Sequence, residues 1–100
     1  MNEYNFELFI KAIECIICIL KNDTSPKTRL QLEEVINKTL GGIDSGFLIY
    51  LLQELDLIEF HKSNFTVQFT QKGKEFTSFE NLQNKNEYLK ILELTLNKRA

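Results

Sequence analysis

LLQELDLIEFHKSNFTVQFTQKGKEF, residues 51–76, contains three joined elements that decide the fold. A leucine-rich helix end runs into a short strand at residues 57–60. A polar turn at 61–64 leads to a second strand at 65–69, in which Phe and Val alternate with Thr and Gln. Thr70 then has the hydroxyl of a helix N-cap. The stretch predicts a helix, a two-stranded ribbon with one apolar face, and another helix.

Two further helices are predicted before this stretch. Apolar residues recur at spacings of three and four over 6–21, which indicates a buried first helix. A second helix begins either at Ser25, with proline at its first position, or at Thr28, which can form a capping box with Gln31. It ends at the glycine pair 41–42. Its apolar face is supplied by Leu30, Leu32, Val35, Ile36 and Leu40.

The third helix starts after Asp44 or Ser45, because either side chain can cap it. At about 100° per residue, its leucines fall on one side and face the core. These are Leu48, Leu51, Leu52 and Leu55. The opposite side shows Gly46, Tyr50 and Gln53, flanked by Phe47, Ile49 and Glu54. This exposed side contains no Lys or Arg.

The predicted fold class is therefore mainly α (α+β). A helix pair, a third helix, a ribbon and a capped helix follow one another as in a winged helix-turn-helix domain with a two-stranded β-wing. A long C-terminal helix completes the prediction. The domain would span residues 1–79, and residues 80–100 would form a helix continuous with it.

VQFTQKGKEF, residues 67–76, resembles the Y-x-L-T-x-K-G-x-x-F signature that closes the wing in small archaeal winged-helix regulators. That group includes dimeric DNA-binding proteins. The matching residues are Phe69, Thr70, Lys72, Gly73 and Phe76, while Val67 replaces the usual tyrosine. KTRL at 27–30 and YLLQELDLI at 50–58 resemble the family's second-helix start and third helix. The resemblance covers roughly residues 6–80.

The resemblance implies a cytoplasmic homodimer that binds double-stranded DNA in transcriptional control or DNA organisation. In this hypothesis the third helix enters the major groove, and the wing lies over the adjacent backbone or minor groove. Gln53 would read adenine, Tyr50 would reach a phosphate and Ile49 would meet a thymine methyl. The candidate DNA-binding residues are Lys27, Arg29, Ser45, Gly46, Ile49, Tyr50, Gln53, His61, Lys62, Ser63, Asn64, Lys72 and Lys74.

The charge balance supports a different hypothesis. Twelve basic and 14 acidic residues give a net charge of −2, whereas nucleic-acid-binding domains usually carry a basic surplus. In this hypothesis the lysines are ordinary solvated side chains scattered over the surface. Phe47, Ile49 and Tyr50 would then form an apolar patch on the third helix that holds a protein partner or a second copy. Clustering of the candidate cations beside the third helix favours DNA, and dispersal among Glu54, Asp56 and Glu59 favours protein.

The C-terminal segment predicts a dimer contact. Leu82, Leu89 and Leu96 recur every seven residues, as in a coiled coil, and this stripe would be exposed to water on a helix projecting from a monomer. The predicted interface comprises Phe79, Leu82, Leu89, Leu92 and Leu96. The alternative is a short fifth helix that folds back on its own domain after a break near residues 84–86.

Other functional classes have little support in the residues. Cys15 and Cys18 lie inside the first predicted helix, where we expect both to pack as small hydrophobes without a metal. His61 is the only histidine and lies in the predicted turn, so no catalytic constellation is expected. No cofactor motif is present, and no apolar run of about 20 residues predicts a membrane span. We expect a non-enzymatic cytoplasmic protein.

Overall fold

The computed structural model describes residues 3–99. Its elements are α1 (Glu3–Asn22), α2 (Arg29–Thr39), α3 (Ser45–Glu54), β1 (Ile58–Phe60), β2 (Val67–Phe69), α4 (Gln71–Glu75), the 3-10 turn η1 (Phe79–Asn81) and α5 (Lys85–Arg99). The two strands form an antiparallel sheet. The described chain is thus mainly helical with a small sheet, which confirms the α+β prediction.

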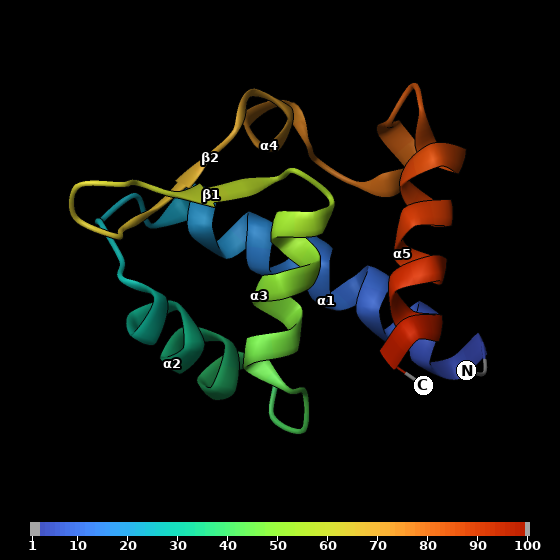
Figure 1. Ribbon diagram of the computed structural model, residues 1–100, viewed down its shortest axis with the longest axis horizontal. Helices are drawn as coiled ribbons and strands as arrows, with labels where there is room; N and C mark the ends of the chain where they lie inside the picture. The colour runs from blue at the N-terminus through green and yellow to red at the C-terminus, as the bar shows by residue number, and fades with distance from the viewer. Residues whose placement is uncertain (1–2, 100) are drawn as a thin grey trace.

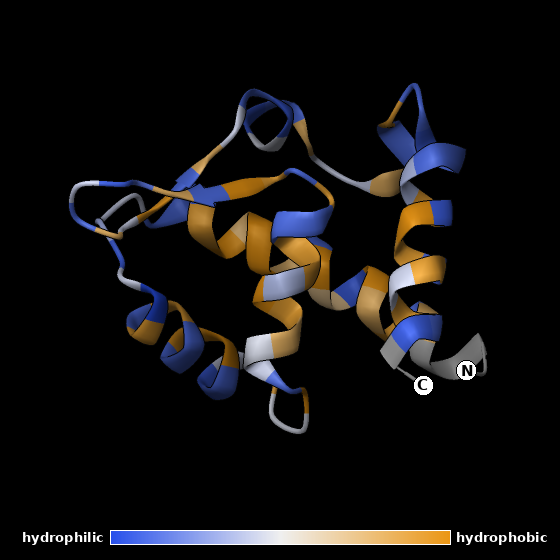
Figure 2. Cartoon of the chain, viewed as in Figure 1, coloured by the Kyte–Doolittle hydropathy of each residue, from blue (hydrophilic) through white to orange (hydrophobic). Residues whose placement is uncertain are grey.

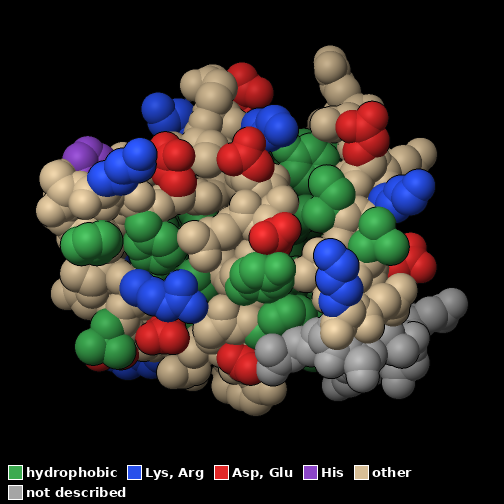
Figure 3. Space-filling model, viewed as in Figure 1, with side chains coloured by type: hydrophobic (Ala, Val, Ile, Leu, Met, Phe, Trp, Pro, Cys, Tyr) green, Lys and Arg blue, Asp and Glu red, His purple; other side chains and the backbone are tan. Residues whose placement is uncertain are grey.

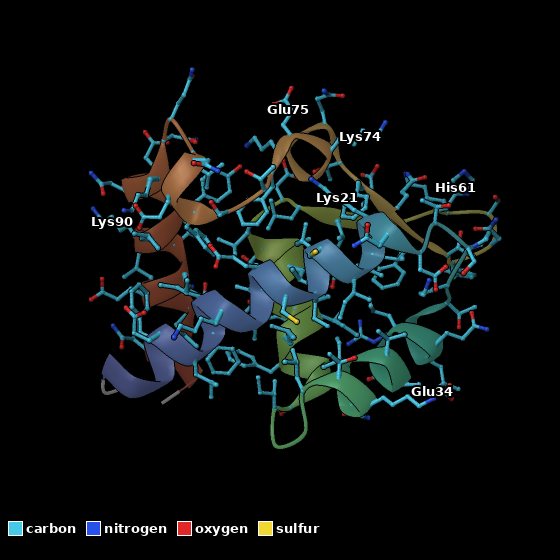
Figure 4. All side chains as sticks on the ribbon, turned by 180° about the vertical axis from the view of Figure 1, so that it is seen from behind. Lys21, Glu34, His61, Lys74, Glu75 and Lys90 are labelled. Carbon is cyan, nitrogen blue, oxygen red and sulfur yellow. The ribbon has the colours of Figure 1, made fainter. Side chains whose placement is uncertain are left out.

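Helix α1 is the centre of the core. Its apolar stripe is buried, as the spacing of three and four predicted, and comprises Ala12, Ile13, Ile16, Ile17 and Leu20. Figure 1 shows α3 crossing in front of α1, and the reversed view in Figure 4 shows α1 in front of α3. Apolar residues of α1, α3 and α5 lie toward the interior that these helices share (Figure 2). One face of α3 is consequently left toward solvent.

The start of α2 is fixed by a capping box. The Thr28 hydroxyl accepts a hydrogen bond from the Gln31 amide at 3.3 Å, and the Gln31 side chain accepts one from the Thr28 amide at 2.9 Å. The second of the two predicted starts is therefore the one used. After Leu40, Gly42 takes a φ of +91°, which glycine adopts without a steric penalty. Leu30 is an exception to the predicted apolar face, because it is exposed at the first turn.

The ribbon is shorter than predicted. β1 pairs with β2 in the register Ile58↔Phe69, Glu59↔Gln68 and Phe60↔Val67. Phe65 was predicted in the second strand but lies outside it, with a φ of +57° and its side chain 69% exposed. The strand begins later because the polar turn closes on residue 65 through backbone hydrogen bonds.

An isolated bridge joins this ribbon to the start of α2. Thr28 pairs antiparallel with Thr66, and the Val67 amide donates to the Lys27 carbonyl at 2.7 Å. The outer edge of β2 is therefore partly covered by the segment that leads into α2. This bridge ties the turn between β1 and β2 to the start of α2.

Thr70 caps α4 as predicted, accepting from the Gly73 amide at 3.0 Å. Gly73 also has a packing role that its sequence position did not reveal. A Cβ on this residue would lie 1.9 Å from the Leu57 carbonyl oxygen. Glycine is required here because α4 lies directly against the backbone that enters β1.

The C-terminal segment folds back on its own domain. α4 ends after five residues, η1 follows, and the chain turns at residues 82–84 before α5 begins. α5 lies beside α1 and α3 (Figure 1). The prediction that residues 80–100 form a helix continuous with the domain is wrong, and the alternative with a break is confirmed. Polar residues at 83–87 interrupt the apolar stripe where the chain turns.

The residues predicted at the dimer interface pack within their own domain instead. Phe79, Leu92 and Leu96 are buried in the common core, and Leu82 and Leu89 are half-buried against it. Because one core contains residues from α1 through α5, residues 85–99 are part of the domain itself. The stripe is covered by α1 and α3, so its burial requires no second copy.

Candidate nucleic-acid interface

The face that α3 presents to solvent is set by its cap and its leucines. The Asp44 carboxylate accepts from the Phe47 amide at 3.1 Å, which fixes the first turn. The four predicted leucines are buried. On the other side Tyr50 is 44% exposed, Gln53 is exposed, and Ser45 and Gly46 are half-buried.

Ile49 does not belong to this face. Its side chain is fully buried, which contradicts the predicted contact with a thymine methyl. Phe47 is also buried, and its ring packs edge-on against Phe9 with centroids 5.5 Å apart. The buried arc of α3 is wider than a single stripe because α1, α2, α5 and β1 all pack against this helix. Neither residue is available to an apolar binding patch of the predicted extent.

Tyr50 lies beside a recess that α5 helps to form. The Tyr50 and Phe47 rings are stacked, with centroids 6.3 Å apart. The recess is lined by Asp44, Gly46, Phe47, Tyr50, Thr95 and Lys98. Lys98 was not a predicted site residue, since the C-terminal segment was expected to point away from the domain. The break at residues 83–87 was the one signal that could have placed it here.

The turn between β1 and β2 is held by several hydrogen bonds. The His61 amide donates to the Thr66 carbonyl at 2.8 Å, and the Phe65 amide donates to the His61 carbonyl at 2.8 Å. Asn64 Oδ1 accepts from both the amide and the hydroxyl of Thr66. His61, Lys62, Ser63 and Asn64 are all exposed.

Lys27 is buried and paired, so it is not available for the predicted phosphate contact. It is 7% exposed, and its ammonium lies 3.1 Å from an Asp23 carboxylate oxygen. The same ammonium donates to the carbonyls of Asp23 and Ser25 at 3.2 Å. Hydrogen bonds from Ser25, followed by the bond and charge of Lys27, lower the pKa of Asp23 to about 2. Lys27 therefore stabilises the loop between α1 and α2.

The other predicted cations do not form one patch. Lys72 lies 3.6 Å from the Asp56 carboxylate, with both side chains more than half exposed. Arg29, Lys62 and Lys74 are exposed on three different elements. Figure 3 shows Lys and Arg side chains interleaved with Asp and Glu on the face that α3 presents. The surface carries both signs of charge.

The cysteines depart in part from expectation. Cys15 is half-buried, but Cys18 is exposed, so the expectation that both pack as small hydrophobes is wrong for Cys18. The Cys18 sulfur accepts from the Asn22 side-chain amide at 3.6 Å. Within residues 3–99, no group of three or more His, Cys, Asp or Glu side chains is arranged to hold a metal ion.

None of the helices in the described part of the chain is both long and apolar enough to cross a membrane. No family model, curated protein or solved structure matches this chain.

Proposed function

We propose that this chain is a winged-helix protein that binds double-stranded DNA through α3 and the β1–β2 turn. The observation that carries the proposal is the Thr28↔Thr66 bridge. It adds a one-residue third strand between α1 and α2, at the position where a winged helix has its first strand. The turn is thereby tied to α2, which packs against α3, so that the exposed side of α3 and the turn belong to one scaffold.

The exposed side of α3 has suitable dimensions and chemistry for a major groove. The groove is about 12 Å wide and admits a single helix. Gln53 carries the amide that pairs with adenine through two hydrogen bonds, and Tyr50 can donate to a phosphate. Gly46 has no side chain, so the backbone of the first turn of α3 would approach the duplex closely. Ser45, at the helix N-terminus, completes the reading surface.

Phosphate contacts would come from elements on either side of α3. Lys62 lies in the turn, and Arg29 opens α2 next to the bridge. Lys72 and Lys74 extend this set along α4. The pair between Lys72 and Asp56 is solvent-exposed and worth only about 0–1 kcal/mol, so a phosphate can replace the carboxylate. With so few cations, we expect binding to be weak and sensitive to salt.

A second candidate function is favoured by the dispersal of the predicted cations, which is the arrangement expected for a protein partner. The exposed face of α3 has no Lys or Arg of its own, and Lys72 is paired with Asp56. Such a mixed surface suits a protein partner that docks on Tyr50 and the recess beside it. The two candidates differ in how they depend on salt and on Lys62.

The test measures duplex affinity as a function of salt for three variants. Lys62→Ala should weaken binding to every sequence and reduce the salt slope by about one unit. Gln53→Ala should cost roughly 1 to 3 kcal/mol on a preferred site and leave non-specific binding nearly intact. Lys90→Ala is the control, since Lys90 lies on α5 and points away from the domain (Figure 4). Equal effects of Lys62→Ala and Lys90→Ala would contradict the proposed interface.

A further inference from the structure

Phe65 has a large aromatic side chain that does not pack into the core. It is 69% exposed, more than any other large hydrophobic residue whose side chain the structure describes. Its backbone also takes a φ of +57°, in the left-handed region that bulky residues rarely enter. Asparagine or glycine would adopt this conformation at a lower cost in stability. An exposed ring on a strained backbone costs stability, and such outliers are typical of functional sites.

The backbone on both sides of Phe65 is also held by hydrogen bonds. The Phe65 amide donates to the His61 carbonyl, and the next residue, Thr66, is bonded to both His61 and Asn64. Thr66 is in turn bridged to Thr28. Phe65 therefore lies at the hydrogen-bonded base of the turn, and little backbone conformational freedom would be lost when its ring makes a contact.

Two basic residues lie close to Phe65 in the chain and at the bridge. Thr28 and Thr66 form an isolated antiparallel bridge, and Arg29 and Phe65 are the residues that adjoin it on one side. Lys62 lies in the same turn, and both basic side chains are exposed. An apolar ring close to two cations is complementary to a nucleic acid, whose stacked bases lie between two lines of phosphates.

We propose that Phe65 is an apolar wedge that enters the minor groove and partly unstacks one base step. This inference rests on the proposed DNA binding and adds a residue to it that neither the sequence motif nor the charge pattern marks. Arg29 and Lys62 would hold the phosphates on each side of the inserted ring. Apolar side chains inserted from the minor groove kink the duplex, so binding should also bend the DNA.

The decisive variant is Phe65→Asn, because asparagine tolerates the left-handed conformation. We expect its thermal midpoint to equal or exceed that of the wild type, while its affinity for a duplex falls by about tenfold or more. A duplex carrying 2-aminopurine should brighten when the wild type binds, because the base unstacks, and should stay dark with Phe65→Asn. Leu94→Asn is the control, since Leu94 is an exposed apolar residue on α5.

Each outcome has a distinct meaning. If Phe65→Asn binds the duplex as tightly as the wild type while Lys62→Ala still weakens binding, the wedge is wrong and the proposed function stands. If Phe65→Asn binds more weakly but the wild type never brightens the probe, the ring contacts the duplex without insertion and the wedge is again wrong. If the wild type does not bind duplex at about 50 mM salt, where electrostatic attraction is strong, the proposed function fails together with the wedge.

Discussion

At Gly73, the absence of one carbon atom determines how α4 joins the sheet. The position that a Cβ would occupy lies within 1.9 Å of the Leu57 carbonyl oxygen. Backbone atoms cannot move aside as a flexible side chain could. In the sequence this residue could be interpreted only as a tolerable glycine in a first helical turn, because the close approach joins residues that are distant along the chain.

We predict that Gly73→Ala destabilises the protein by about 1 to 3 kcal/mol or prevents folding, because the added carbon overpacks the contact. Gly41→Ala is the matched control, since a Cβ there would meet nothing within 4 Å. It should change stability by less than about 0.5 kcal/mol. Urea unfolding of both variants measures the difference. Equal midpoints would contradict the packing of α4 against Leu57.

Asp23 supplies a pH dependence at the same scale. Its pKa is lowered from 3.8 to about 2 by hydrogen bonds from Ser25 and by Lys27. The charged form is thus favoured by folding, so its contribution to stability is complete above pH 3.8 and is lost as the pH falls toward 2. We predict that Asp23→Asn unfolds at nearly the same urea concentration as the wild type at pH 2, but at a lower concentration at pH 5. A constant difference between the two proteins at both pH values would be inconsistent with this role.

Among the elements, α5 shows how a sequence pattern can fit two structures. A seven-residue leucine spacing suits a coiled coil between two copies, and it suits equally well a helix that lies against its own domain. The pattern alone does not identify the partner. The interruption at residues 83–87 decides the matter, because it allows the chain to turn and cover the stripe with α1 and α3.

We predict that Leu92→Ala lowers the free energy of unfolding by about 2 to 5 kcal/mol, as expected for a leucine in a packed core. Leu92 is fully buried, whereas Leu94 in the same helix is 53% exposed. Leu94→Ala should therefore change stability by less than about 0.5 kcal/mol. If both variants unfold like the wild type and Leu92→Ala alone changes the sedimentation coefficient, α5 would be a contact between copies instead.

For the whole molecule, the helix caps and the leucine face of α3 were predictable from the sequence. The packing between separate elements was less predictable. The caps at Thr28, Asp44 and Thr70 and the leucine face of α3 were predicted because they depend on neighbours within one turn. The burial of Ile49 and Lys27 was missed, since each depends on how separate segments pack together. The extent of the exposed face of α3 depends on where α5 packs, which patterns within one helix do not specify.

The central claim is that α3 and the β1–β2 turn form one DNA-binding surface. The most direct measurement is an NMR titration of the wild-type protein with a short DNA duplex at about 50 mM salt, where phosphate attraction is strong. We predict that the amide shifts concentrate in residues 45–54 and 61–66 and diminish as salt is added. An absence of shifts at saturating duplex, or shifts confined to other parts of the chain, would contradict it.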